Sequence, residues 1–212
     1  MGEDIAAMRR GYRRPPLDER ELPADPFALF STWFDEAAAS GVVEPNAMVL
    51  ATSAADARPS ARFVLLKGVD ERGFVFYTNL ESRKAREVAA NPVAALCFGW
   101  LDLERQVRVE GSVERVSQDE AQQYWRSRPL ESQRSAWASP QSSVVASRAD
   151  LEREVAAIAG RFGDDVPLPE FWGGMRLVPV SIEFWQGGPR RLHDRLCYNR
   201  AGALWTMERL AP

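Results

Sequence analysis

The only histidine of the chain lies in a stretch rich in cationic side chains. His193 is placed between Arg191 and Arg195, downstream of Trp185 and of the turn-forming run Gly187-Gly188-Pro189. This run predicts a hairpin, and because side chains alternate along a strand, Arg191, His193 and Arg195 are expected on one face of its second arm. Two guanidiniums and an imidazole suit an anion or an electron-rich planar ring. A solvated basic edge strand would show the same residues, so both interpretations stand at this point.

A second polar group lies where an apolar run passes into a helix. Tyr77 and Thr78 end the run, and Ser82, Arg83 and Lys84 open the helix. The free N–H groups and the dipole of a helix N-terminus favour an anion, to which hydroxyl and cationic side chains add. The pattern predicts a phosphate cradle, although it lacks the glycine spacing of a P-loop or a dinucleotide-binding turn. The alternative is an ordinary capped helix with basic residues in its first turn.

A third group follows on another predicted helix. Tyr124 and Arg128 are four residues apart and share a helix face, and Ser132 comes after a proline break. A phenol, a guanidinium and a hydroxyl that converge would bind a second oxyanion. Pairing of Arg128 with a carboxylate such as Asp119 or Glu131 is an equally open interpretation.

Two further strands carry polar residues among apolar ones. Arg62 and Lys67 flank an apolar run, either as two surface cations or as anchors for separate anions. Gln106 lies in a long alternating strand, where its amide could bond a heterocycle edge or water. Of the 27 basic residues only Lys67 and Lys84 are lysines, which either marks places that need a compact charge or is chance.

These residues need elements to position them, and the chain alternates short strands with a few helices. Asp25-Pro26 predicts a helix to about Ser40, Ser117 with Glu120 forms a capping box, and residues 82–91 and 147–162 also read as helices. Residues 132–137 are expected to form a short turn. The expected strands are 47–52, 61–67, 73–78, 93–100, 104–116, 175–186, 190–199 and 203–209. This order predicts an α+β fold with an antiparallel barrel of roughly six to eight strands.

Composition excludes several classes of function. The net charge of -3 and the pI near 5.4 argue against bulk capture of nucleic acid or of an anionic membrane. Cys97 and Cys197 form neither a disulfide framework nor a metal set, and we expect reduced thiols in a cytoplasmic protein. No zinc spacing, nucleophile elbow, membrane-length apolar run or signal peptide is recognisable. We expect a mobile arm at residues 1–24, a single domain at 25–212, and chemistry supplied by an organic cofactor.

Taken together, the motifs resemble those of the pyridoxine/pyridoxamine 5'-phosphate oxidase family, which has the FMN-binding split-barrel fold, from about Arg9 to Pro212. The matching stretches are Arg62-Phe63-Val64-Leu65-Leu66-Lys67, Phe76-Tyr77-Thr78-Asn79, Ser82-Arg83-Lys84-Ala85, Glu104-Arg105-Gln106-Val107, Ser127-Arg128-Pro129, Phe171-Trp172-Gly173-Gly174, Ile182-Glu183-Phe184-Trp185-Gln186-Gly187, Arg191-Leu192-His193-Asp194-Arg195 and Arg209-Leu210-Ala211-Pro212. Met175 and Arg134 depart from the family pattern, which prefers an aromatic and an aliphatic residue there. These departures affect local packing and leave the expected reaction unchanged.

The resemblance implies a split barrel with peripheral helices, a homodimer with FMN in clefts at the subunit interface, and oxidation of pyridoxine or pyridoxamine 5'-phosphate by dioxygen. The FMN contacts that it implies are Arg62, Phe63, Val64, Leu65, Leu66, Lys67, Tyr77, Thr78, Arg83, Lys84, Gln106, Gln141, Ser142, Trp185 and Arg195. The implied substrate contacts are Lys67, Tyr124, Arg128 and Ser132 for the phosphate, Arg191 and His193 over the ring as catalytic residues, and Arg9 with Tyr12 from a covering segment.

Two other classes of protein remain as alternatives. One is a split-barrel flavoprotein that acts on another substrate, against which the substrate-phosphate residues argue. The other is a non-catalytic protein that binds FMN or pyridoxal phosphate and produces no peroxide.

Overall fold

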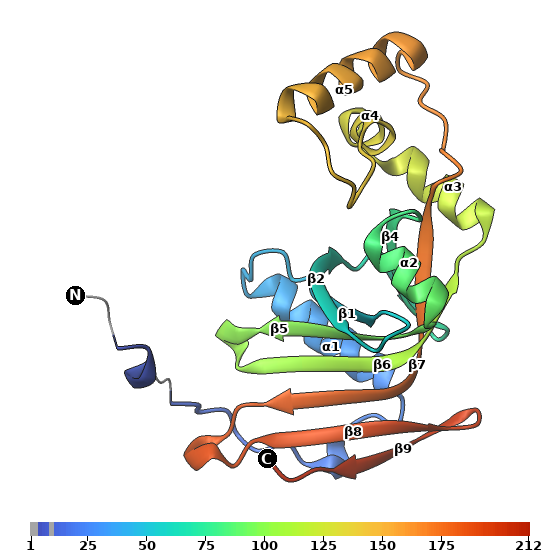
Figure 1. The fold of residues 1–212 in the computed structure, drawn as a ribbon. Helices are drawn as coiled ribbons and strands as arrows, with labels where there is room; N and C mark the ends of the chain where they lie inside the picture. Colours follow the sequence, from blue (N-terminus) through green and yellow to red (C-terminus); the bar gives the residue numbers. More distant parts are fainter. Residues whose placement is uncertain (1–3, 9–10) are drawn as a thin grey trace. The chain divides into compact units, whose positions relative to one another are not determined.

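The computed structural model describes residues 4–8 and 11–212, which Figure 1 traces in sequence colours. Their contacts divide the chain into two compact units. The first unit comprises the described residues up to Val49 together with Ala95–Glu110 and Pro179–Pro212, and the second comprises Leu50–Ala94 and Gly111–Val178. The chain therefore passes between the units several times, and each unit is built from segments that are distant in sequence.

One long helix provides much of the apolar core of the first unit. Helix α1 (Pro26–Ala39) begins at Asp25, whose carboxylate accepts a hydrogen bond from the Phe27 N–H at 3.0 Å. Proline at the first helical position needs no N–H donor, so this start is favourable. Leu29, Phe30 and Trp33 are buried along one stripe of the helix. The helix predicted from Asp25-Pro26 is thus confirmed.

Several strands of one sheet contribute residues to the first unit, and its last strands pair antiparallel. β5 (Val93–Trp100), β6 (Arg105–Arg115) and β7 (Trp172–Gln186) are neighbours in that order, and β7 then pairs with β8 (Asp194–Ala201), which pairs with β9 (Leu204–Arg209). Trp185 on β7 lies opposite Arg195 on β8. Alternate residues of these strands point inward, so Ile182 and Phe184 are fully buried.

The second unit contains the shorter strands. β1 (Ala47–Ser53) pairs with β2 (Pro59–Leu65), and β7 pairs with β4 (Gly73–Asn79), which pairs with β3 (Gly68–Asp70). In the β4–β7 ladder Tyr77 lies opposite Gly174. A Cβ at Gly174 would come within 2.7 Å of the Tyr77 ring and 2.5 Å of Val116, so only glycine lets that ring lie over β7.

Four helices complete the second unit. They are α2 (Arg83–Ala90), α3 (Gln118–Ser127), α4 (Leu130–Ala138) and α5 (Arg148–Phe162), and α4 packs against α5. The predicted capping box is present, since the Ser117 hydroxyl accepts from the Glu120 N–H at 3.1 Å. Trp125 of α3 forms a small buried cluster with Val166 and Trp172. Among the described residues no helix is long and apolar enough to cross a bilayer.

Two predictions about local structure are wrong, and one strand is not predicted. Residues 132–137 belong to helix α4 rather than to a short turn, and the additional short strand β3 makes nine strands in the described part of the chain. The second wrong prediction concerns the histidine stretch. β8 begins only at Asp194, because Pro189–Arg191 forms a 3₁₀ turn in which Arg191 has a φ of 67°. Arg191 and His193 therefore do not lie on a strand, and alternation does not place them on one face with Arg195.

Candidate active site

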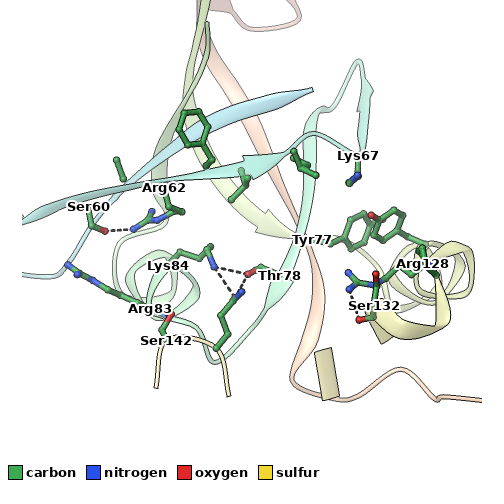
Figure 2. Close-up of a pocket in the computed structure, with 17 residues that line it drawn as sticks. Ser60, Arg62, Lys67, Tyr77, Thr78, Arg83, Lys84, Arg128, Ser132 and Ser142 are labelled. Atoms are coloured by element: carbon green, nitrogen blue, oxygen red, sulfur yellow. Dashed lines mark hydrogen bonds between the residues drawn. The ribbon is translucent and has the colours of Figure 1, made fainter. Parts of the chain in front are cut away.

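The second unit contains a cavity of about 740 Å³ lined by predicted site residues. Strand β2, the end of β4, the start of α2, the end of α3 and the loop after α4 form its walls. Five of the described lining side chains are cationic and none is an aspartate or glutamate; the cations are Arg62, Lys67, Arg83, Lys84 and Arg128. In Figure 2 they gather in two places, with Arg62, Arg83 and Lys84 at one end and Lys67 and Arg128 at the other. The cavity can therefore hold two anionic groups at separate points.

The first of these places, which we name the α2 cluster, consists of Arg62, Thr78, Arg83, Lys84, Gln141 and Ser142. The Lys84 ammonium donates to Thr78 Oγ1 at 3.1 Å and to Gln141 Oε1 at 2.9 Å. The Arg83 backbone N–H, at the helix N-terminus, donates to Ser142 Oγ at 3.1 Å. Backbone and side-chain donors thus converge at one helix end, as anion binding requires.

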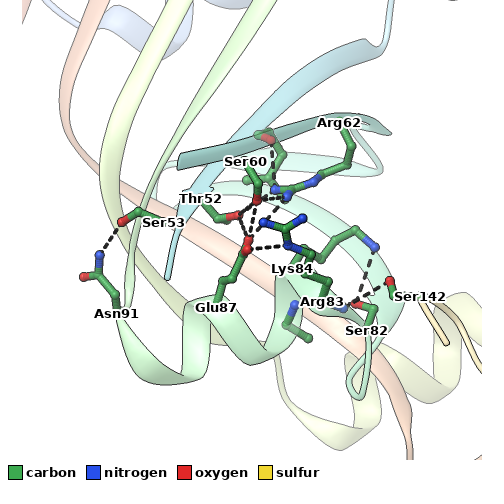
Figure 3. Close-up of polar contacts among 12 residues, drawn as sticks. Thr52, Ser53, Ser60, Arg62, Ser82, Arg83, Lys84, Glu87, Asn91 and Ser142 are labelled. Carbon is green, nitrogen blue, oxygen red and sulfur yellow. Dashed lines mark hydrogen bonds and ion pairs between the residues drawn. The ribbon is translucent and has the colours of Figure 1, made fainter. Parts of the chain in front are cut away.

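A buried carboxylate, which the sequence did not single out, organises this cluster (Figure 3). Glu87 is 6% exposed and accepts from Thr52 Oγ1 at 2.5 Å, Ser60 Oγ at 2.6 Å and Arg83 Nε at 2.8 Å. Arg62 adds a longer contact at 3.3 Å. The hydrogen bonds from Ser60 and Thr52, with that from Arg83, lower the pKa of Glu87 to about 2, so it stays ionised. Arg83 and Glu87 are spaced i, i+4 on α2, and this spacing is the sequence feature from which their ion pair could have been predicted.

The pKa of the Lys84 ammonium lies near neutral pH. Burial, together with the nearby charge of Arg62, lowers the pKa of Lys84 to about 8. Both causes disfavour the ammonium form, which an arriving anion would stabilise. The cluster is therefore short of negative charge even with Glu87 present.

The second place, the α3 cluster, consists of Lys67, Tyr124, Arg128 and Ser132. The Arg128 guanidinium lies 4.7 Å above the Trp172 ring, and Arg128 Nη2 donates to the Ser132 carbonyl at 2.9 Å. Arg128 Nε is buried without a hydrogen-bond partner, and burial lowers the pKa of Arg128. The predicted alternative of a carboxylate partner for Arg128 is not observed among the described residues. An unpaired buried donor beside a cavity is a site that a ligand oxygen can satisfy.

Aromatic stacking fixes the walls of the α3 cluster. The rings of Tyr77 and Tyr124 are nearly parallel with centroids 4.0 Å apart, and Trp172 stacks on Tyr77 at 5.4 Å. Tyr77 also donates weakly to the Glu120 carbonyl at 3.4 Å. Helix α3 and strands β4 and β7 are thereby joined where Tyr124 and Arg128 project.

Most of the remaining predicted residues belong to the first unit, where the rings of Tyr12, Trp185 and His193 form a cluster of their own. Tyr12 lies edge-on to His193 at 5.3 Å and to Trp185 at 5.6 Å. The Gly188 N–H donates to His193 Nδ1 at 3.2 Å, so a neutral imidazole carries its proton on Nε2. A Cβ at Gly187 would lie 2.6 Å from the Tyr12 ring, which explains glycine at that position.

Four other predicted residues have distinct surroundings. Arg195 makes a two-point ion pair with Glu183, at 2.8 and 3.1 Å, and Gln106 is half-buried on β6. Arg191 is exposed in the turn before β8. Leu66 is buried at 7% exposure and does not line the cavity, whereas Arg9 lies outside the described residues.

Comparison with known proteins identifies the class of fold. Over 90% of this chain and 100% of the other, it superposes with a TM-score of 0.73 on a pyridoxamine 5'-phosphate oxidase-related, FMN-binding protein from Nostoc punctiforme at 19% identity. PhzG from Burkholderia lata, whose crystal structure was determined in complex with tetrahydrophenazine-1-carboxylic acid, is 31% identical, with a TM-score of 0.89 over 95% of this chain and 100% of that one. The fold is that of the FMN-binding split barrels, as the motifs predicted.

Family models and curated relatives define the family more closely. Residues 34–162 match the pyridoxamine 5'-phosphate oxidase model, and residues 172–212 match the pyridoxine 5'-phosphate oxidase C-terminal dimerisation region. The pyridoxine/pyridoxamine 5'-phosphate oxidase of Burkholderia multivorans is 57% identical over 98% of this chain and 99% of its own length. That of Pseudomonas paraeruginosa is 55% identical over the full length of both. This chain belongs to the pyridoxine/pyridoxamine 5'-phosphate oxidase family, which comprises FMN-dependent oxidoreductases.

Proposed function

We propose that this protein oxidises pyridoxine 5'-phosphate or pyridoxamine 5'-phosphate to pyridoxal 5'-phosphate, with FMN as cofactor and dioxygen as oxidant. Pyridoxine phosphate and dioxygen give the aldehyde and hydrogen peroxide. Pyridoxamine phosphate gives an imine that water hydrolyses, which releases ammonia as well. The observation that carries this proposal is the cavity with two separate cationic clusters, because cofactor and substrate each bring one phosphate.

The α2 cluster fits the phosphate of FMN in charge and in donors. Arg62, Arg83 and Lys84 carry three positive charges and Glu87 one negative charge, which leaves two to balance a phosphate of about -1.5 to -2. Strand β2, from Arg62 to Leu65, forms the adjoining cavity wall. Bound FMN would accept the hydride from the substrate and pass the electrons to dioxygen. We propose further FMN contacts from Leu66, Lys67, Tyr77, Thr78, Gln106, Gln141, Ser142, Trp185 and Arg195.

The α3 cluster fits the phosphate of the substrate. Lys67 and Arg128 supply charge, Tyr124 and Ser132 supply hydroxyl donors, and the unpaired Arg128 Nε gains a partner when an oxygen binds. Anchoring the phosphate at one end of the cavity limits the positions available to the pyridine ring. This restriction is the main contribution to the rate that we assign to the protein.

Arg191 and His193 are proposed to orient the pyridine ring. Because His193 Nδ1 already accepts from Gly188, its Nε2–H is available as a donor to an oxygen or nitrogen of the substrate. The exposed Arg191 guanidinium can stabilise negative charge that develops on the ring. Tyr12, which lies against His193, is proposed to cover the site, and Arg9 is proposed to join it.

We also propose a homodimer located in the cytoplasm. The dimer is supported by the match of residues 172–212 to a dimerisation region and by Phe63, which is 77% exposed on β2. Two unpaired cysteines, Cys97 and Cys197, fit a reducing compartment. The mobile arm at residues 1–24 and the single domain at 25–212 stay predictions.

One assay tests the function against its alternatives. The purified yellow protein is mixed in air with pyridoxine 5'-phosphate, pyridoxamine 5'-phosphate or unphosphorylated pyridoxine, and pyridoxal phosphate and peroxide are followed together. We expect equal amounts of both products from the phosphorylated substrates and far slower turnover of pyridoxine. Ligand binding without peroxide would indicate a non-catalytic binding protein. No reaction with either phosphorylated compound would indicate a flavoprotein with another substrate.

The ring-orienting residues are tested with Arg191→Ala and His193→Ala. Each variant is expected to retain FMN, measured by its flavin absorbance, and to lose turnover by about 10- to 100-fold, since both act on the bound ring. Rates like those of the wild type in both variants would rule out these roles.

A further inference from the structure

Arg176 is a charged residue in the core of the second unit to which the proposed reaction assigns no role. It lies on β7 and is only 2% exposed. Nη1 bonds Asp70 Oδ1 at 2.6 Å, and Nη2 bonds Glu120 Oε1 at 2.8 Å. Taking a guanidinium out of water is costly, and here two carboxylates on different elements offset that cost. The side chain therefore links β7 to two other parts of the fold at fixed distances.

Each of these carboxylates lies on an element that carries a residue of the α3 cluster. Asp70 ends β3, the strand that begins directly after Lys67. The Lys67 N–H donates to the Val75 carbonyl at 2.8 Å, and Val75 is the register partner of Arg176. Lys67, Val75 and Arg176 thus lie side by side on neighbouring backbone segments.

The other carboxylate belongs to helix α3. Glu120, Tyr124 and Arg128 are spaced four residues apart, so they follow one stripe along the helix and its end. A hollow of about 390 Å³ is lined by Arg176 and both its carboxylates together with Lys67 and Tyr124. The ion pairs and the substrate-phosphate residues are therefore parts of one continuous local structure.

We propose that Arg176 is a positioning residue that sets the distance between Lys67 and the Tyr124–Arg128 stripe, and so the affinity for the substrate phosphate. The inference rests on the proposed function, since it assigns the α3 cluster to that phosphate. An arginine fork holds two carboxylates in a fixed geometry, whereas an ammonium is a point charge. Lysine at this position would keep the charge and lose the two-point link.

The same two carboxylates provide a matched control. Arg72 also pairs with Asp70, at 2.6 Å, and approaches Glu120 at 3.7 Å, but its side chain is 57% exposed. Exposed ion pairs contribute little and hold no fixed geometry. Arg72→Gln removes a cation from the same charge cluster and leaves the buried link intact.

The test compares Arg176→Met, Arg176→Lys and Arg72→Gln as holoenzymes. Measurements are kcat and KM for pyridoxine 5'-phosphate, and the Kd values of pyridoxal 5'-phosphate and FMN. For both Arg176 variants we expect KM and the pyridoxal phosphate Kd to rise about tenfold or more, with kcat within about threefold and a clearly smaller change in FMN affinity, because Lys67 is one of many proposed FMN contacts. Arg72→Gln should match the wild type in all four quantities.

Several results would overturn the proposal. Unchanged pyridoxal phosphate affinity in Arg176→Met, full rescue by lysine, or an equal loss of FMN and pyridoxal phosphate affinity would each do so. If Arg176→Met fails to fold, Asp70→Asn and Glu120→Gln each remove one arm and must raise the same Kd. A wild type that binds pyridoxal phosphate but oxidises nothing would refute the proposed function alone, since the Kd comparison still decides on Arg176. A wild type that does not bind it would refute both.

Discussion

The two cationic clusters of the cavity use different means to hold their charges. In the α2 cluster a buried carboxylate, Glu87, bonds Arg83 and contacts Arg62, and hydroxyls fill its remaining positions. In the α3 cluster no carboxylate of the described residues contacts Arg128, which rests on the faces of Trp172 and Trp125. One cluster is organised by ions and the other by aromatic rings.

The two arrangements suit ligands that stay bound for different lengths of time. The carboxylate fixes the α2 cations before a ligand arrives, which lowers the cost of ordering them and suits a cofactor that stays bound. A cation–π contact supplies only about 0.5–2 kcal/mol, and the hydrogen bond from Arg128 to the Ser132 carbonyl uses Nη2 alone, so the guanidinium is not neutralised before a ligand arrives. A ligand held in this way can leave after each turnover. The comparison implies that each cluster can be weakened without the other.

The largest effects should come from removing one guanidinium from each cluster. Arg128→Met is expected to raise the pyridoxal phosphate Kd by about 100-fold and leave FMN affinity unchanged, since a charge-assisted hydrogen bond contributes about 1.5–3 kcal/mol. Arg62→Met is expected to do the reverse. Titrations of apoprotein with FMN and of holoprotein with pyridoxal phosphate measure both. Equal loss of both ligands in either variant would show that the clusters are not independent.

Glu87→Gln should break the organisation of the α2 cluster and lower stability. The folded pKa of Glu87 is about 2, below its usual value of 4.5, so ionisation stabilises the fold above pH 4.5 and this contribution is lost as pH falls toward 2. We expect a loss of about 1–3 kcal/mol in the free energy of unfolding at pH 7. Urea unfolding of the apoprotein from pH 7 to 3 should show the difference constant above pH 4.5 and smaller below it. A difference that grows with acid would contradict this assignment.

The sequence predicted which cationic and hydroxyl residues form the two clusters, but not the contacts that hold them in place. Arg83 and Lys84 were recognisable because a helix start after a strand is a local pattern, and Tyr124 with Arg128 because helical spacing is local too. Glu87 was missed although it lies four residues after Arg83. Its partners Thr52 and Ser60 come from distant strands, and only the fold brings them together.

In the histidine stretch, residues 185–195, the prediction of the backbone is wrong. The predicted alternation requires residues 190–199 to be strand throughout, but Pro189 cannot donate to a ladder and Arg191 takes a left-handed φ. The first strand ends at Gln186 as predicted, but the second begins only at Asp194, four residues later than predicted. The chemical types of Arg191 and His193 remained informative, while their shared face did not.

A pH titration of FMN binding should test the role of Lys84 in the α2 cluster. Its pKa is lowered from 10.5 to about 8 by burial and by Arg62, and a bound phosphate would favour the charged form. FMN affinity should therefore fall by up to about tenfold per pH unit above pH 8. Fluorescence titration from pH 7 to 9.5 measures this. In Lys84→Met the slope above pH 8 should vanish, and a slope that persists there would point to another group.

The smallest expected effects come from one hydroxyl in each cluster. Ser142 accepts from the Arg83 backbone N–H, and Ser132 lines the cavity beside Arg128. Loss of a single hydrogen bond costs about 1 kcal/mol, so Ser142→Ala should weaken FMN, and Ser132→Ala pyridoxal phosphate, about fivefold each. In the double variant the two losses should add, because the clusters share no hydrogen bond through these serines. Coupling well above about 0.5 kcal/mol would mean that the two phosphate sites communicate, and would remove the basis for treating them as separate solutions to anion binding.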